Sequence, residues 1–300
     1  MSNFDHDGCY RDGLHEKTKA GRQWCRQHGP ASRSGRAYSG GGAARRIDVD
    51  PGDAAVSTSD VWDDATASRY DDEESAMFAA EVVDPAVHLL SELAGSGRAL
   101  EFAIGTGRLA IPLVRHGVPT AGIDLSPAMI RRLRDKVAER EVPAAVGDMA
   151  RARFPGEFSL VFVAFNSISN LCTQADQVAC FRNAARHLAV GGSFVVELFV
   201  PPLRRLVPGQ TTVPFAFGAD HTGVDCLDVV TQTGTSHHYV RLHGDQFSHH
   251  TNNFRYIWPA ECDLMAELAG LEFVARYADW DRSPFTADSA QHISIWRKSH

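Results

Sequence analysis

Two glycines and one acid are the residues whose spacing could do chemistry in this sequence. The apolar run 98–104 ends at Gly105-x-Gly107, and a helical pattern follows it. Glycines at such a turn let the backbone approach a ligand closely, and the helix N-terminus adds a partial positive charge. Asp124 ends the next apolar run, where a carboxylate can accept both ribose hydroxyls of an adenosine. The pattern predicts an adenosine-containing ligand, and both NAD and S-adenosylmethionine (SAM) satisfy it.

Two details favour SAM over NAD. Glu101 lies inside the first apolar run, where a dinucleotide-binding fold usually keeps an apolar residue, and AGIDLSPAM follows the second. With these residues the sequence resembles the class I SAM-dependent methyltransferases, whose glycine motif reads acid-x-Gly-x-Gly-x-Gly. Ala103 stands where that family has its first glycine. The counterparts of the family's later motifs are Asp124-Leu125-Ser126-Pro127 with Met129, Gly147-Asp148-Met149 and Phe165-Asn166-Ser167.

The resemblance covers most of the chain beyond residue 70, and it implies SAM as the cofactor. Asp124 would hold the ribose, Asp148 and Met149 would contact the adenine, and Glu101 would orient the methionine end. Tyr70 would close over the cofactor from an N-terminal helical segment; a tyrosine that only packs is the alternative. The implied cofactor-binding residues are Tyr70, Glu101, Ala103, Gly105, Thr106, Gly107, Asp124, Leu125, Met129, Gly147, Asp148, Met149, Phe165 and Asn166.

Length and composition exclude several classes of protein. The 300 residues are 44% hydrophobic, enough for a sizeable core, and a net charge of −7 argues against a nucleic-acid-binding surface. The six cysteines form no CxxC pair and suggest reduced thiols in a cytosol. No apolar run approaches the roughly 18 residues of a membrane span, and no secretory signal is recognisable. We expect a cytoplasmic protein without membrane or nucleic-acid partners; the oligomeric state stays open.

The chain is expected to divide into a tail and one domain. Residues 1–57 are rich in Gly, Ser, Ala and Arg and poor in large apolar residues, which predicts a disordered or poorly ordered N-terminal tail. Residues 58–300 form the predicted SAM-dependent methyltransferase domain. Within it, residues 200–258 break the regular pattern and are expected to form a β-rich substrate lid.

From residue 98 onward, apolar runs alternate with helical patterns. This alternation predicts an α/β fold with a doubly wound, Rossmann-like sheet that binds ligands at the carboxyl ends of its strands. Thr173 and Asp176 have the spacing of a capping box, and Gly191-Gly192 is expected to stop the helix that they begin. The resemblance implies seven strands, mostly parallel with an antiparallel last strand. We expect strands at 98–104, 119–124, 143–147, 158–165, 191–199, 271–279 and 291–297, and helices at 107–116, 127–140, 174–189 and 260–269.

The lid region contains two β-rich runs, 227–242 and 246–258, on either side of His243-Gly244-Asp245. They predict an antiparallel hairpin or a small sheet. A turn centred on Gly244 and Asp245 would place His238 and His249 on the same face of the hairpin. Because the spacing supplies no third ligand beside them, we expect no metal site.

Methyl transfer from a sulfonium requires the nucleophile to be held in line with the methyl group more than it requires a strong acid or base. A hydroxyl or a protonated amine still needs a base, and the candidates are Glu197, at the end of the fifth strand, and His238 in the lid. A solvated side chain is the alternative for each. We therefore predict methyl transfer from SAM to an oxygen or nitrogen of a small-molecule acceptor. An NAD(P)-dependent oxidoreductase and a non-catalytic SAM-binding protein are the alternatives.

Overall fold

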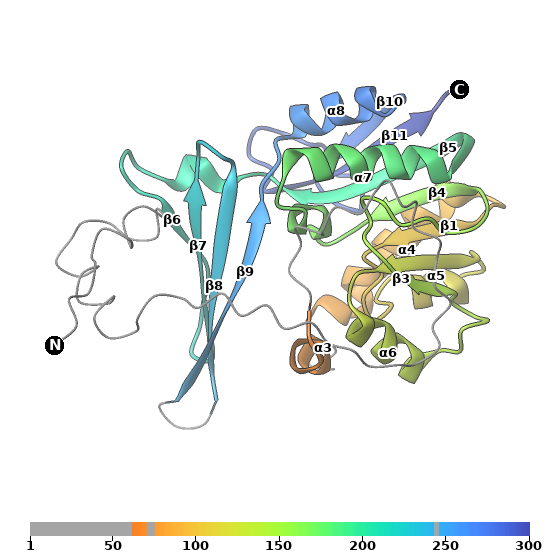
Figure 1. Ribbon diagram of the computed structural model, residues 1–300. Helices are drawn as coiled ribbons and strands as arrows, with labels where there is room; N and C mark the ends of the chain where they lie inside the picture. Colours follow the sequence, from red (N-terminus) through yellow and green to blue (C-terminus); the bar gives the residue numbers. More distant parts are fainter. Residues whose placement is uncertain (1–61, 71–75, 243–245) are drawn as a thin grey trace, which may run out of the picture. The chain divides into compact units, whose positions relative to one another are not determined.

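The computed structural model describes residues 62–70, 76–242 and 246–300, so the predicted tail 1–57 lies outside the described residues. In the described part, a seven-stranded sheet has the order β10-β11-β5-β4-β1-β2-β3 (Figure 1). β1 to β5 run parallel, and β11 is antiparallel to both of its neighbours. This confirms the predicted fold class. The strands are β1 (Ala99–Phe102), β2 (Thr120–Asp124), β3 (Ala144–Val146), β4 (Phe158–Val163), β5 (Leu188–Phe199), β10 (Leu271–Tyr277) and β11 (Gln291–Lys298).

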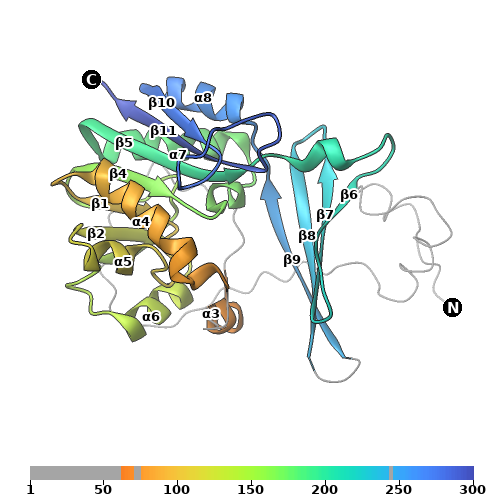
Figure 2. The ribbon, with the colours of Figure 1, turned by 180° about the vertical axis from the view of Figure 1, so that it is seen from behind.

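Helices cover both faces of this sheet, and β1 and β2 are therefore buried along their whole length. α7 and α8 pack on one face, where Phe181 and Met265 join the core around Trp296. α4 and α5 cover the other face through Leu90 and Leu113, and Figure 2 shows α4 across it. The helices are α3 (Asp64–Tyr70), α4 (Ala80–Ala94), α5 (Ala110–Arg115), α6 (Pro127–Lys136), α7 (Gln174–His187) and α8 (Pro259–Leu268), with short 3₁₀ turns η2 (Ala76–Phe78), η3 (Ser167–Asn170) and η4 (Pro202–Arg205).

Thr173 caps the start of α7 as its spacing predicts, but the predicted stop is wrong. The Thr173 hydroxyl accepts the Asp176 N–H at 3.1 Å and donates to the Asp176 carboxylate at 2.7 Å. α7 ends at His187, and Gly191 and Gly192 lie inside β5 instead of terminating the helix. The reason is local: Leu188 already has extended backbone angles, while Gly191 takes a positive φ of 82° that lets the strand continue through an irregular register with β4.

The β-rich insertion is a four-stranded antiparallel sheet, which confirms the small sheet of the two predicted alternatives. Its order is β6-β7-β8-β9. The run 227–242, expected as one strand, contains the end of β7, a turn at which Gln232 has a φ of 58°, and β8. The strands are β6 (Thr212–Phe217), β7 (His221–Asp228), β8 (Thr233–Arg241) and β9 (Phe247–Arg255).

The base of this sheet is attached to the core by apolar and ionic contacts. Val213, Leu227 and Phe254 are buried and pack with Phe199 at the end of β5. Arg255, at the end of β9, donates to Gln177 on α7 at 2.6 Å and to Glu261 on α8 at 2.8 Å. The insertion is therefore anchored at the edge of the large sheet where β5 ends.

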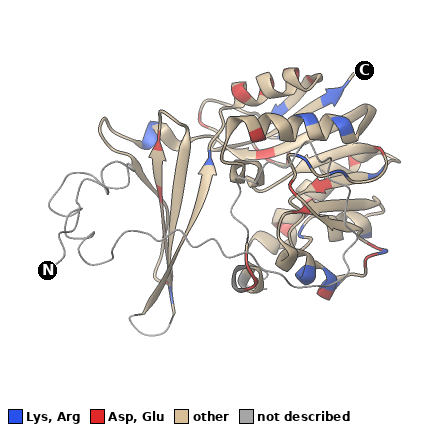
Figure 3. Ribbon diagram, in the orientation of Figure 1, with Lys and Arg blue, Asp and Glu red and all other residues tan. Residues whose placement is uncertain are grey.

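Charged residues are sparse on the insertion: its described strands carry Asp225, Asp228, Arg241 and Arg255 (Figure 3). These strands therefore lack the basic stripe that tracks a nucleic-acid backbone. Among the described residues, no helix is both long and apolar enough to cross a membrane.

Candidate active site

A pocket lies at the carboxyl ends of β1, β2 and β3, as the topology of a doubly wound sheet requires. Its empty volume is about 620 Å³, part of which is open to solvent. The residues that line it are Trp62, Tyr70, Ala103, Gly105, Ile123, Asp124, Leu125, Ser126, Met129, Gly147, Asp148, Met149, Ser167 and Asn170.

Asp124 is the central acid of this pocket. Its two carboxylate oxygens accept the N–H of Gly105 at 2.7 Å and the N–H of Ser126 at 2.8 Å. Burial raises the pKa of Asp124, and these two hydrogen bonds oppose that shift. The carboxylate therefore ties the glycine turn after β1 to the start of α6, and each oxygen keeps a further lone pair for a ligand.

The glycine turn itself has an unusual backbone. Ala103, Gly105 and Gly107 all have positive φ angles, of 54°, 57° and 90°. A Cβ on Gly107 would lie 2.6 Å from Leu133 Cδ1, so the turn packs directly against α6. Ala103 therefore holds a conformation that favours glycine, which explains why the resembled family has glycine at this position.

Glu101 is a buried carboxylate beneath that turn, 4% exposed, and its Oε2 has no hydrogen-bond partner. Burial raises the pKa of Glu101 well above its usual value, and the nearby Arg108 guanidinium opposes the shift. An unpartnered buried carboxylate oxygen is costly unless a donor or a cation reaches it. Glu101 adjoins the pocket without lining it.

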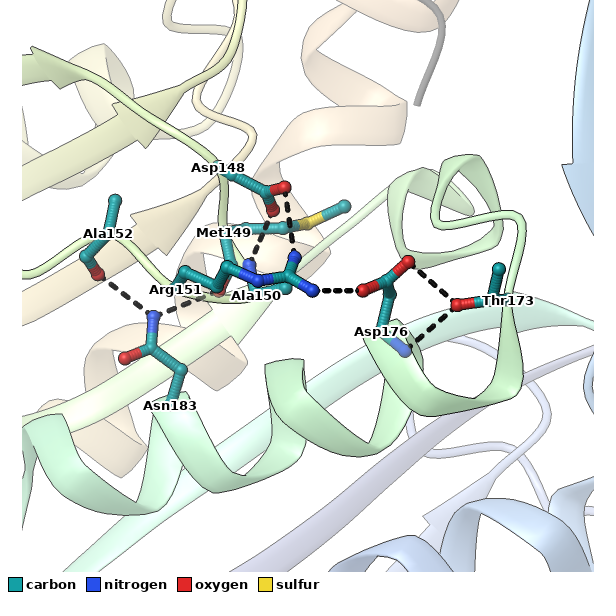
Figure 4. Close-up of polar contacts among 8 residues, drawn as sticks. All are labelled: Asp148, Met149, Ala150, Arg151, Ala152, Thr173, Asp176 and Asn183. Carbon is teal, nitrogen blue, oxygen red and sulfur yellow. Dashed lines mark hydrogen bonds and ion pairs between the residues drawn. The ribbon is translucent and has the colours of Figure 1, made fainter. Parts of the chain in front are cut away.

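The loop after β3 is held from below by α7 (Figure 4). Asp148 accepts the Ala150 N–H at 2.8 Å and pairs with Arg151, whose guanidinium also binds the buried Asp176 carboxylate. The Asn183 amide donates to the carbonyls of Met149 and Ala152, each at 2.9 Å. The loop that carries Asp148 and Met149 into the pocket is thus bound to α7 at several points.

Helix α3 covers one side of the pocket. Tyr70 lies edge-on to Trp62, with 5.3 Å between ring centroids, and both pack against the buried Met129. The Ser126 hydroxyl donates to the Trp62 carbonyl. Tyr70 thus lines the pocket and also packs against other side chains. Its position is compatible with a tyrosine that closes over the cofactor and with one that only packs.

The structure brings most of the predicted cofactor-binding residues together. Glu101, Thr106, Gly107, Phe165 and Asn166 do not line the pocket; they support or adjoin its wall. Thr106 is buried, and its carbonyl accepts a hydrogen bond from Lys136 at 3.1 Å. Lining residues that the prediction missed are Trp62, Ile123, Ser126, Ser167 and Asn170.

Ser126 and Ser167 lie within motifs already identified in the sequence, Asp124-Leu125-Ser126-Pro127 and Phe165-Asn166-Ser167. No sequence signal marks Trp62, whose carbonyl accepts the Ser126 hydroxyl although the two residues are 64 positions apart.

The two predicted base candidates lie in different elements. Glu197 is on β5, and its carboxylate accepts the N–H of Phe165 and the indole N–H of Trp280. His238 is on β8, and the expectation that it shares a face with His249 is wrong. It pairs directly with His250, whose ring stacks on it at 4.7 Å, while His249 hydrogen-bonds to His237 at 3.1 Å. The register differs by one residue from the assumed turn, which reverses the faces.

His238 sits in a row of imidazoles across three strands. Its Nδ1 is 3.1 Å from Nε2 of His221, and His250 stacks on its other side. Burial, followed by these neighbouring histidines, lowers the pKa of His238 to about 4. Within the described residues no group of three or more His, Cys, Asp or Glu side chains could hold a metal ion.

Similar proteins show which family the fold and pocket define. Residues 99–192 match a family described as "Methyltransferase domain". The solved CcbJ methyltransferase of Streptomyces caelestis is 35% identical, with a TM-score of 0.66 over 72% of this chain and 89% of that one. Cypemycin N-terminal methyltransferase of a Streptomyces species is 25% identical over 248 residues, covering 80% of this chain and 98% of that protein.

The SAM-bound structure of CalS10, an amino pentose methyltransferase from Micromonospora echinaspora, has the same fold at 20% identity. Its TM-score is 0.57 over 74% of this chain and 92% of that one. The chain belongs to the class I SAM-dependent methyltransferases. It is an enzyme that uses SAM as methyl donor, and this decides against both the oxidoreductase and the non-catalytic binding protein.

Proposed function

We propose that the protein methylates an amine nitrogen of a small-molecule acceptor. The name of the cypemycin N-terminal methyltransferase, whose length this chain covers almost completely, supports a nitrogen acceptor over an oxygen one. We also propose that residues 200–258 form a lid that contacts the acceptor. The supporting observation is that the base of the four-stranded sheet adjoins the end of β5. A cytoplasmic location and the absence of nucleic-acid and membrane partners stay predictions.

The pocket residues fit SAM, which when bound supplies an electrophilic methyl group on a sulfonium. In this proposal Asp124 holds the ribose, and Asp148 with Met149 receives the adenine. The Asp124 carboxylate, which lines the pocket and keeps a further lone pair on each oxygen, is the observation that carries the assignment. Glu101 adjoins the pocket wall and would orient the methionine end from beneath the glycine turn. Tyr70 and Trp62 exclude water from the side that α3 covers. The sequence-based set is proposed in full, extended by Trp62, Ser126, Ser167 and Asn170.

Methylation of a neutral amine depends more on alignment of its nitrogen with the methyl group, in a pocket that excludes water, than on a base. An amine nitrogen attacks with its lone pair and loses its proton afterwards, so a base assists release instead of activation. Glu197 and His238 stay predictions for that task. The pKa of about 4 makes the His238 imidazole neutral at pH 7, able to accept a proton but weakly basic.

The test is turnover with SAM on a panel of amines. Purified protein is incubated with a nucleotide-linked amino pentose, a peptide with a free N-terminus and a matched set of hydroxyl analogues, and products are identified by mass spectrometry. We expect an amine to gain a methyl group and its hydroxyl analogue to stay unchanged. Methylation of a hydroxyl analogue instead would make the protein an O-methyltransferase.

A further inference from the structure

The turn that follows β4 has a strained backbone. Phe165 and Asn166 are consecutive, neither is glycine, and both have positive φ angles, of 53° and 61°. Such a pair is uncommon and persists only where the surroundings hold it. The turn leads into η3, whose Ser167 and Asn170 line the pocket, and Phe165 is 42% exposed. A strained turn beside the site requires an explanation.

β5 supplies the contacts that hold this turn. Oε2 of Glu197 accepts the Phe165 N–H at 2.6 Å, and the Glu197 carbonyl accepts the Asn166 N–H at 3.3 Å. Two residues further on, the Phe199 N–H donates to Oδ1 of Asn166 at 2.6 Å. Both residues of the turn are therefore tied to β5, and the shortest tie to Phe165 is the Glu197 side chain.

Two further groups hold the Glu197 carboxylate in place. Oε1 accepts the indole N–H of Trp280 at 2.9 Å, and an Arg108 guanidinium nitrogen lies 4.0 Å from Oε2. The same guanidinium stacks on the Phe165 ring, 5.0 Å from its centroid. One face of that ring is thus covered by Arg108, which itself belongs to the glycine turn.

We propose that Glu197 is a positioning residue for methyl transfer: it holds Phe165 in the left-handed conformation from which the chain enters η3, whose Ser167 and Asn170 line the pocket. This inference rests on the proposed function and assigns Glu197 a task other than that of a base. Each carboxylate oxygen already accepts a hydrogen bond from the protein, one of them from the strained turn itself. Trp280 fixes the carboxylate so that Oε2 faces Phe165.

A double-mutant cycle separates positioning from base catalysis. If Glu197 acts through Phe165, Glu197→Gln should lower kcat about tenfold to a hundredfold, because an amide leaves one of the two donors without an acceptor. In a Phe165→Gly background, whose turn needs no support, the same change should lower kcat less than threefold. Within each background, Glu197→Gln should change the Kd of S-adenosylhomocysteine less than threefold. Rates are measured with the amine that turns over in the panel, across pH 6 to 9.

A base role gives the opposite results. Glu197→Gln would then cost the same factor in both backgrounds and would remove a limb of the pH–rate profile, and either outcome overturns the proposal. Glu272→Gln, at an exposed glutamate on β10, is the matched control and should retain full turnover.

A measurement without any acceptor keeps this inference separate from the proposed function. Hydrogen exchange at the Phe165 amide should be at least tenfold faster in Glu197→Gln than in the wild-type protein, since its acceptor is lost. The Glu272→Gln control should exchange at the wild-type rate. Unchanged exchange in Glu197→Gln overturns the proposal, whether or not an amine is methylated. Faster exchange together with methylation of a hydroxyl analogue would support positioning and refute the amine assignment alone.

Discussion

At the scale of single residues, the Asp124 carboxylate has two tasks, since it orders the glycine turn and faces the pocket. We expect Asp124→Asn to weaken the binding of S-adenosylhomocysteine roughly tenfold to a hundredfold, because losing a hydrogen bond to a charged group costs about 1.5–3 kcal/mol. Titration calorimetry measures this directly. Asp135→Asn, at an exposed acid on α6 that pairs with Arg132 at 3.6 Å, is the control. Equal affinity of both variants would refute the ribose assignment.

Glu101 predicts a link between SAM binding and pH. Burial holds its pKa well above the usual value, so its carboxyl is protonated at pH values where a free glutamate is ionised. A bound ammonium favours the ionised form, so binding should release a proton and SAM affinity should rise with pH up to the raised pKa. Calorimetry in two buffers of different ionisation enthalpy detects the proton. Glu101→Gln should release none, and identical enthalpies for the wild-type protein in both buffers would contradict the assignment.

At the scale of elements, the close packing of the glycine turn on α6 can be measured against a matched glycine. Gly107 and Gly117 have similar φ angles, 90° and 93°, but a Cβ meets Leu133 at 2.6 Å only at Gly107 and open space at Gly117. Gly117→Ala should cost about 1–2 kcal/mol of backbone strain. Gly107→Ala should cost a further 1–3 kcal/mol, roughly, for overpacking. Urea denaturation gives both values, and equal losses would show that the turn can move away from α6.

The histidine row predicts how the insertion sheet responds to acid. The folded-state pKa of His238, about 4, lies below its ordinary value of 6.5. The unfolded chain therefore binds the proton first, so the stability that the neutral ring contributes is complete above pH 6.5 and is lost as pH falls toward 4.

We expect the melting temperature to fall between pH 7 and pH 5, and to fall less in His238→Asn. Differential scanning fluorimetry across this range measures it, with the exposed His116→Asn as control. If the melting temperature fell equally with pH in the wild-type protein, His238→Asn and His116→Asn, the prediction would be contradicted.

The sequence predicted well those helices and strands whose position is set by a local pattern, such as an apolar run or a helix N-cap. β1, β2 and β4 are apolar runs buried on both faces, and Ser126 and Thr173 cap their helices with their own side chains. β6 was missed because Pro214 and exposed aromatic residues hide its alternation. The register of β8 and β9 depends on a turn whose geometry the sequence leaves open. Trp62 enters the site through tertiary packing alone, so no local signal could reveal it.

At the scale of the whole molecule, residues 1–55 are proposed to be dispensable for folding and cofactor binding. Their composition offers little apolar surface to bury, whereas the described core clusters begin at Ala67, against which Trp62 and Tyr70 pack. A chain starting at Val56 should melt within a degree or two of the full-length protein and bind S-adenosylhomocysteine equally well. Calorimetry and thermal melting test this, and a large fall in either would show that the tail contributes to the fold.

Two adjacent residues of α7 carry a consequence for how the two ligands bind. Asp176 is bound to Arg151 of the loop beneath Asp148, while the next residue, Gln177, accepts from Arg255 and donates to its carbonyl at the base of the insertion sheet. A shift of this one helical turn would reach both the cofactor loop and the sheet above the acceptor. Coupling between binding sites is reciprocal. If bound SAM changes the affinity for the acceptor by some factor through this turn, the bound acceptor changes the affinity for SAM by the same factor. A favourable coupling would stabilise the ternary complex relative to either half-filled state, and an unfavourable coupling would destabilise it.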